Sequence, residues 1–141
     1  MKAKPILPAS IPGAVPVRAT AGAAALVTVV AGLGVRSAVH GDVAKYAGDA
    51  LYTVLIHTLV VLIAPRVRPL TAAGAALAFS WAVELAQLTG VPAELSHRSG
   101  VARLVLGSTF NAPDLLWYAA GAGLGWVIHS RLRSGRGPAR P

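Results

Sequence analysis

Residues 70–88 read LTAAGAALAFSWAVELAQL, a run of nineteen residues in which Glu84 is the only charged side chain. An α-helix of this length can cross the ~30 Å hydrocarbon core of a bilayer, because it rises about 1.5 Å per residue. A carboxylate near the bilayer centre costs roughly 2.5–3.5 kcal/mol on insertion scales, and less near the interface. We therefore expect Glu84 to face a partner or a polar cavity inside a helical bundle.

Three other apolar runs of similar length cover residues 19–35, 47–64 and 112–128. The first follows a basic start, as the apolar core of a signal peptide does. It is longer than that core usually is, and no A-x-A cleavage site follows it, so we interpret it as an uncleaved span. These runs predict an all-α fold, an integral membrane bundle of four transmembrane helices.

The composition agrees with a membrane chain. Of the 141 residues, 55% are hydrophobic and only 13% are charged, whereas a soluble domain typically has about 25% charged residues. The formal net charge is +8, but the basic residues lie between or outside the apolar runs and form no basic helix interleaved with aromatics. We therefore expect membrane lipid as a partner and no nucleic acid.

The basic residues also predict orientation and domain boundaries. Nine lie in residues 1–18, 65–69 and 131–141, and four lie in the two other connections. The side with more Lys and Arg is normally cytoplasmic, so we expect a multi-pass protein of the inner (cytoplasmic) membrane with both termini in the cytoplasm. Residues 1–18, with four prolines, predict an extended tail; residues 19–130 form the bundle, and a basic tail follows.

This topology brings the acids of three helices towards the outer face. Asp49 lies near the start of the second helix, Glu84 near the end of the third and Asp114 at the start of the fourth. Polar residues at helical spacing accompany them, which predicts one outward-facing polar layer. The candidate ligand-binding residues are Asp49, Tyr52, Glu84, Gln87, Arg103, Asp114 and Tyr118.

Each acid also has a structural interpretation. Asp114 follows a proline in the first helical turn, where a carboxylate complements the helix dipole. Asp49 lies too far into the second helix to be an N-cap, which indicates a role in a binding site or in a buried ion pair. Glu84 is either part of a site or paired with Arg103 or Arg98. The sequence leaves these alternatives open.

The longest connection covers residues 90–110. Its apolar centre, residues 101–107, predicts a short interfacial or re-entrant helix, in which Arg103 turns inward to an acid or snorkels to the headgroups. The sequence GAGLG at residues 121–125 is a G-x-x-x-G pattern that indicates close helix contact. Neither metal-ligand spacing nor a phosphate-binding glycine motif is present, so we expect no cofactor and no metal.

Three segments carry a family resemblance: GDALY (48–52), ELAQ (84–87) and RLVLGSTFNAPDLLWYAAG (103–121). They resemble a family of small bacterial four-helix membrane proteins of unknown function, which is similar to the VanZ-like superfamily, whose namesake is associated with teicoplanin resistance. VanZ-like proteins usually place an Asn after the last Asp, where this chain has Tyr118, so the chain resembles the unknown-function branch. The resemblance covers roughly residues 20–130. The positions it carries over are Gly48, Asp49, Tyr52, Glu84, Gln87, Arg103, Gly107, Phe110, Asp114, Tyr118 and Gly121.

Three functions follow as hypotheses. The first is binding or transport of a cell-envelope component, with an anionic lipid or an envelope precursor as the candidate ligand. In it, Arg103, Arg98 and Arg36 take the anionic group while Glu84 and Asp49 orient it. The second is a structural protein whose polar layer only fixes helix packing. The third is a membrane enzyme acting on lipid-linked phosphates, with a carboxylate as general base.

Overall fold

A computed structural model describes residues 14–137 of the chain. These residues form helices and contain no β-strand. Four long helices coincide with the four predicted apolar runs, and two short helices lie in the connection between the third and the fourth. The elements are α1 (Ala14–Ala38), α2 (Asp42–Ile63), α3 (Pro69–Ala86), the 3₁₀ turn η1 (Gln87–Thr89), α4 (Val91–Arg98), α5 (Gly100–Leu106) and α6 (Asp114–Ser134).

The predicted tails differ from the structure at their inner ends. Helix α1 begins at Ala14, so the last part of the predicted extended tail is helical. A proline at position 16 is compatible with this because the first helical turn needs no backbone donor. Helix α6 continues to Ser134, several residues into the predicted basic tail. The rest of both tails, residues 1–13 and 138–141, lies outside the described residues.

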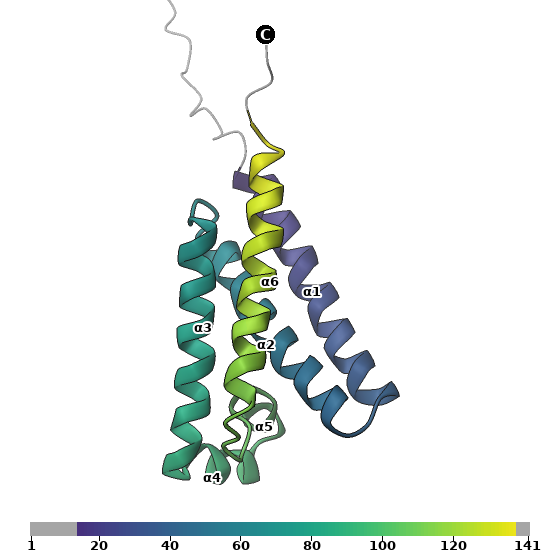
Figure 1. Cartoon of the computed structure of the whole chain (residues 1–141), viewed down its shortest axis with the longest axis vertical. Coiled ribbons are helices and arrows are strands. Elements are labelled where there is room, and N and C mark those ends of the chain that lie inside the picture. The colour runs from purple at the N-terminus through teal and green to yellow at the C-terminus, as the bar shows by residue number, and fades with distance from the viewer. Residues whose placement is uncertain (1–13, 138–141) are drawn as a thin grey trace, which may run out of the picture.

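The long helices alternate in direction (Figure 1). Helix α2 packs against α1 on one side and against α3 and α6 on the other, and α3 also packs against α6. The start of α1, the α2–α3 turn and the end of α6 lie together at one end of the molecule, which we call the terminal end. Helices α4 and α5 and the α1–α2 connection lie at the other end, which we call the cap end.

Three helical segments within the described residues are long and apolar enough to cross a membrane. They are Val17–Ala38, Asp42–Ile63 and Pro69–Thr89. Helix α6 is not among them. Although it has 21 residues, it includes Asp114 at its start and Arg131 and Arg133 near its end. The predicted number of four spans is therefore not confirmed by helix length and composition.

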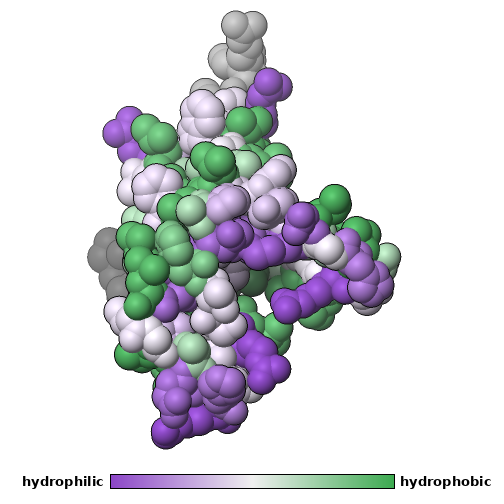
Figure 2. All heavy atoms as spheres, turned by 60° about the horizontal axis from the view of Figure 1, so that its bottom comes forward, coloured by the Kyte–Doolittle hydropathy of each residue, from purple (hydrophilic) through white to green (hydrophobic). Residues whose placement is uncertain are grey.

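The distribution of polar and apolar side chains is the reverse of that in a soluble bundle. The buried side chains are small or polar, whereas large hydrophobic side chains point outward: Ile63 is 78% exposed and Leu116 is 74% exposed. Green hydrophobic atoms accordingly cover much of the surface in Figure 2. Small residues that allow close approach and polar residues that face inward are typical of helices packed in lipid, so the fold is compatible with a membrane protein. The buried residues include Thr53, His57, Ala72, Ala76, Ser80, Glu84 and Asp114.

The closest approach of α6 to α2 occurs at Gly121. A Cβ atom at this position would lie 2.2 Å from the backbone oxygen of Ala50. One turn further along α6, a Cβ on Gly125 would lie 3.0 Å from the ring of His57. The G-x-x-x-G pattern therefore marks a close helix contact, as predicted, and the contact is between α6 and α2 of the same chain.

Candidate functional site

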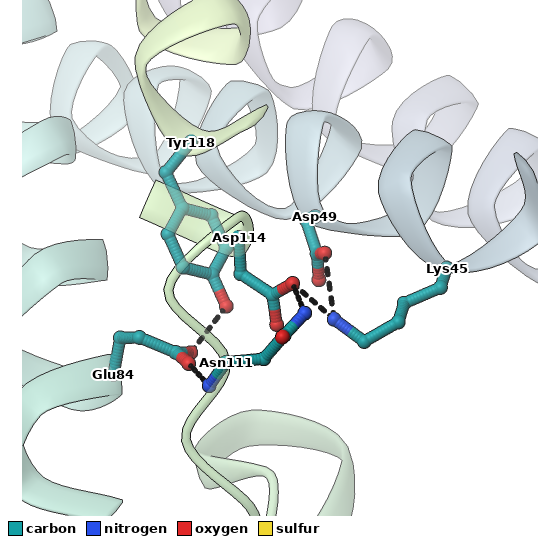
Figure 3. Close-up of polar contacts among 6 residues, drawn as sticks. All are labelled: Lys45, Asp49, Glu84, Asn111, Asp114 and Tyr118. Atoms are coloured by element: carbon teal, nitrogen blue, oxygen red, sulfur yellow. Dashed lines mark hydrogen bonds and ion pairs between the residues drawn. The ribbon is translucent and has the colours of Figure 1, made fainter. Parts of the chain in front are cut away.

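Four of the predicted site residues come together at the cap end. Figure 3 shows the side chains of Asp49 from α2, Glu84 from α3, and Asp114 and Tyr118 from α6 lying towards one another. Two residues outside the predicted set, Lys45 and Asn111, complete the group. We call this group the carboxylate cluster; its members are Lys45, Asp49, Glu84, Asn111, Asp114 and Tyr118.

Glu84 is the most deeply buried member, with 1% of its surface exposed. One carboxylate oxygen accepts a hydrogen bond from the backbone N–H of Asn111 at 2.7 Å. The other accepts one from the Tyr118 hydroxyl at 3.0 Å. Since hydrogen bonds to a charged acceptor are stronger than neutral ones, Glu84 ties α3 to the start of α6 and to the loop before it.

The predicted ion pair of Glu84 with Arg103 or Arg98 is wrong. Arg98 instead pairs with Glu94 at 2.7 Å, one helical turn away on the exposed face of α4. Arg103 donates to the backbone oxygen of Ser96 at 3.4 Å. Within residues 14–137, Glu84 forms no ion pair, and its partners are the uncharged donors of Asn111 and Tyr118.

Asp114 lies at the start of α6, as predicted, and also contacts other members of the cluster. It is the first residue of α6, where its charge complements the N-terminal end of the helix dipole. It is 4% exposed, and its carboxylate oxygen accepts hydrogen bonds from Lys45 Nζ and Asn111 Nδ2. The contact with Lys45 joins α6 to the start of α2.

The outer part of the cluster is accessible. The side chain of Lys45 is 41% exposed and that of Asp49 is 18% exposed, and their charged atoms lie 3.5 Å apart. Asp49 Oδ2 is shielded from solvent but accepts no hydrogen bond from any described residue. Figure 2 looks towards the cap end and shows hydrophilic residues gathered there around a hollow. The cluster thus has a buried, fully hydrogen-bonded base and an accessible rim formed by Lys45 and Asp49.

The remaining predicted residues hold the short helices in place instead of joining the cluster. The Tyr52 hydroxyl donates to the backbone oxygen of Val105 at 2.9 Å, and Gln87 Nε2 donates to that of Leu106 at 2.8 Å. Both bonds fasten α5, which matches the short helix predicted within residues 101–107. Tyr52 also reaches the edge of the cluster, because its ring centroid lies 6.1 Å from that of Tyr118.

The structure explains why residue 107, one of the positions carried over by the family resemblance, is a glycine. It ends α5 with φ of 64°, a backbone conformation that favours glycine. A Cβ there would also lie 2.7 Å from Gln87 Nε2. By contrast, a Cβ at Gly48 would meet no atom within 4 Å, so this structure gives no packing reason for glycine at that position.

Sequence reasoning placed Lys45 and Asn111 beside the acids but did not include them among the site residues. The spacing held the signal: Lys45 precedes Asp49 by one helical turn, and Asn111 lies three residues before Asp114. Helix α4 was missed altogether, although a proline in its first turn and the Glu94–Arg98 spacing are both typical of a short helix.

The chemistry of the cluster follows from its donors and acceptors. Asp49 and Lys45 form an ion pair at 3.5 Å in which the Lys45 side chain is 41% exposed, so the rim can bind a polar group carrying both donors and acceptors. Residues 14–137 contain no group of three or more His, Asp or Glu side chains placed to hold a metal ion.

A family model described as "Protein of unknown function (DUF2809)" matches residues 38–122, which is more than half of the chain. The chain belongs to the DUF2809 family. The matched region of this DUF2809 protein runs from the end of α1 into α6 and contains the whole carboxylate cluster. No curated protein and no solved structure matches the chain. A family of unknown function was expected, but the comparisons lend no support to a similarity with the VanZ-like superfamily.

Proposed function

We propose that this DUF2809 protein is a multi-pass protein of the cytoplasmic membrane of a bacterium. In this proposal it has four spans and binds the polar part of a cell-envelope component at the outer end of the bundle. The observation that carries the proposal is the rim of the carboxylate cluster, where the partly exposed ammonium of Lys45 pairs with Asp49 Oδ2 at 3.5 Å and this oxygen accepts no closer hydrogen bond within the described residues.

The arrangement of α6 supports a fourth span. Its polar and small residues, Asp114, Tyr118 and Gly121, are buried against α2 and α3, whereas Leu116 and Leu124 point outward and are at least half exposed. A helix whose charged residue is covered by its neighbours and whose outer face is apolar can lie in lipid despite a modest overall hydropathy.

The distribution of basic residues supports an orientation with the terminal end in the cytoplasm. Nine basic residues fall within residues 1–18, 65–69 and 131–141, against four, Arg36, Lys45, Arg98 and Arg103, that lie in or next to the connections at the cap end. Because Lys and Arg accumulate on the cytoplasmic side, the cap end and the carboxylate cluster face outward in this proposal.

The structure alters the class of ligand that the site suits. The arginines expected to bind an anionic group do not enter the cluster, since Arg98 pairs with Glu94 and Arg103 donates to Ser96. The Lys45 ammonium instead pairs with two carboxylates, Asp49 and Asp114. Asp49 Oδ2 lies 3.5 Å from the Lys45 ammonium and accepts no closer hydrogen bond within the described residues, so a ligand that supplies a donor there gains free energy. Ammonium groups and sugar hydroxyls of envelope components have the required donors.

We expect Asp49→Asn to reduce ligand binding at least tenfold while leaving the protein folded. The substitution keeps the shape of the side chain but removes the charge that attracts a donor-bearing group. The measurement is native mass spectrometry of protein purified from its own membrane in mild detergent, with quantification of the molecules that remain bound.

Asp42→Asn is the matched control, because Asp42 lies in the first turn of the same helix and is exposed. Wild type and Asp42→Asn should retain an amine- or hydroxyl-bearing molecule that Asp49→Asn lacks. If wild type carries no such molecule, or if Asp49→Asn retains it equally, the binding proposal is wrong.

A packing role is the second candidate, and the base of the cluster favours it. Both oxygens of Glu84 are occupied by donors of the protein itself, so this residue stabilises the fold whether or not the rim binds a ligand. An enzyme acting on lipid-linked phosphates is less well supported, because Arg103, a cation that could stabilise developing negative charge, donates to Ser96 outside the cluster.

A further inference from the structure

A cavity of about 470 Å³ lies between α1, α2 and α6. Its size falls within the range of about 300–1,000 Å³ that is typical of ligand pockets. Helix α1 packs along α2, and α6 packs on another face of α2. The cavity is thus bordered by three helices but is open to the surroundings, and its lining includes residues near the terminal end, opposite to the carboxylate cluster.

The lining of the cavity has an apolar part and a basic part. Val27 on α1, Val54 on α2 and Ile128 on α6 contribute apolar surface. Arg66 in the α2–α3 turn and Arg136 just beyond α6 contribute guanidinium groups. Arg133 adds a third, and no Asp or Glu lines the cavity.

The three arginines retain hydrogen-bonding capacity. Arg133 uses one guanidinium nitrogen to donate to the backbone oxygen of Val67 at 3.0 Å, and Arg136 donates to the Thr20 hydroxyl at 3.3 Å. A guanidinium group has five N–H donors, and none of the three arginines forms an ion pair within the described part of the chain. Arginine clusters of this kind bind phosphate oxygens, often in bidentate geometry.

An apolar cavity next to three positive charges fits an amphiphile with an anionic head. We propose that this cavity binds an anionic phospholipid, with an acyl chain between α1 and α6 and the phosphate at Arg66, Arg133 and Arg136. The site is independent of the outward-facing one, because it shares no residue with the carboxylate cluster and has the opposite charge. In the orientation proposed above, its arginines meet the cytoplasmic leaflet, where anionic lipids attract basic residues.

Titration of the detergent-solubilised protein with phosphatidylglycerol, followed by native mass spectrometry, tests the proposal. Arg66→Gln combined with Arg136→Gln should weaken phosphatidylglycerol binding at least tenfold, whereas Arg133 is kept because it supports the α2–α3 turn. The matched control is Arg36→Gln combined with Arg98→Gln, which removes two charges at the cap end and should leave the affinity unchanged.

The acyl chain is tested separately. Ala24 lines the cavity, and Ala24→Phe should fill part of it and weaken phosphatidylglycerol binding. Its neighbour Ala23 is exposed and does not line the cavity, so Ala23→Phe should bind as wild type does. Unchanged affinity in both the double arginine variant and Ala24→Phe would overturn the proposal, as would full competition by inorganic phosphate, which has no acyl chain.

A second measurement uses the wild-type protein and so does not depend on the folding of any variant. Phosphatidylglycerol with a photoreactive group in its acyl chain should cross-link to peptides from residues 17–28 and 125–136. Cross-links confined to α3, or distributed evenly over all outward faces, would contradict the site. If Asp49→Asn loses the envelope component but still binds phosphatidylglycerol, the phospholipid site is unaffected. The proposal for the carboxylate cluster and the proposal for the cavity can therefore be contradicted separately.

Discussion

Glu84→Ala is expected to lower the stability of the protein more than any other single substitution in the carboxylate cluster. The change leaves the Asn111 N–H and the Tyr118 hydroxyl without the acceptor they have now. Each unsatisfied buried donor costs about 1–3 kcal/mol, and the lost side-chain volume adds a cavity. The sum of these costs is a large part of the free energy of unfolding, which is typically about 5–15 kcal/mol for a folded protein. Thermal unfolding in detergent, followed by tryptophan fluorescence, measures the loss.

Two milder variants grade the effect. Glu84→Gln keeps the volume and one carbonyl oxygen but turns an amide N–H₂ towards a donor, so its melting temperature should lie between those of wild type and Glu84→Ala. Tyr118→Phe removes one of the two donors to the buried Glu84 carboxylate and should lower the free energy of unfolding by about 1.5–3 kcal/mol, as is typical of a hydrogen bond to a charged group. The matched control is Glu94→Ala, since Glu94 is an exposed acid whose side chain forms a surface ion pair with Arg98, and exposed pairs contribute about 0–1 kcal/mol. Equal stability of Glu84→Ala and Glu94→Ala would show that the buried network does not support the fold.

Gly121→Ala is expected to destabilise the bundle strongly through a steric conflict. The added Cβ would lie 2.2 Å from the backbone oxygen of Ala50, and backbone atoms cannot move aside as the end of a flexible side chain can. Helices α2 and α6 must therefore separate. Overpacking in a well-packed interior typically costs about 1–3 kcal/mol, and here the separation also pulls Asp114 away from Lys45. The same thermal unfolding measurement applies.

Gly123→Ala is the matched control, because it adds the same methyl group two residues away on α6, where no atom lies within 4 Å of the new Cβ. We expect it to melt at the temperature of wild type or slightly above. If the two alanine variants unfold alike, then α2 and α6 do not approach each other at Gly121 as the structure has them.

Much of the helical layout could be predicted from the sequence, because apolar runs of membrane length are a strong signal. Each of the four runs coincides with a long helix, although the ends differ: residues 47–64 were predicted where α2 covers Asp42–Ile63. The first residues of α2 include polar side chains such as Lys45, so the apolar run begins later than the helix does. Whether α6 crosses the membrane could not be decided in this way, since its acid Asp114 is covered by other helices whereas Arg131 and Arg133 near its end are exposed.

The depth of the acids could also be predicted, since Asp49, Glu84 and Asp114 do meet at one end of the bundle. Their partners could not. Helical spacing identifies neighbours on one helix, but the Lys45–Asp114 contact depends on how α2 crosses α6, and the Asn111–Glu84 bond depends on the path of a loop. Long arginines such as Arg103 can reach in many directions, so their sequence position says little about which group they contact. The cavity between α1 and α6 depends on helix spacing that no sequence pattern encodes.

The orientation of the cap end is tested most directly by labelling introduced cysteines, because the chain has none of its own. Single-cysteine variants at His40, Arg68, His97 and Gly135 sample the two ends of the bundle in turn. In intact cells, a membrane-impermeant maleimide should label the cysteines at positions 40 and 97 at once, and those at 68 and 135 only after lysis. Labelling of position 135 together with 97 would mean that α6 does not cross the membrane. Labelling of 68 and 135 without 40 and 97 would place the carboxylate cluster on the cytoplasmic side and contradict an outward-facing site.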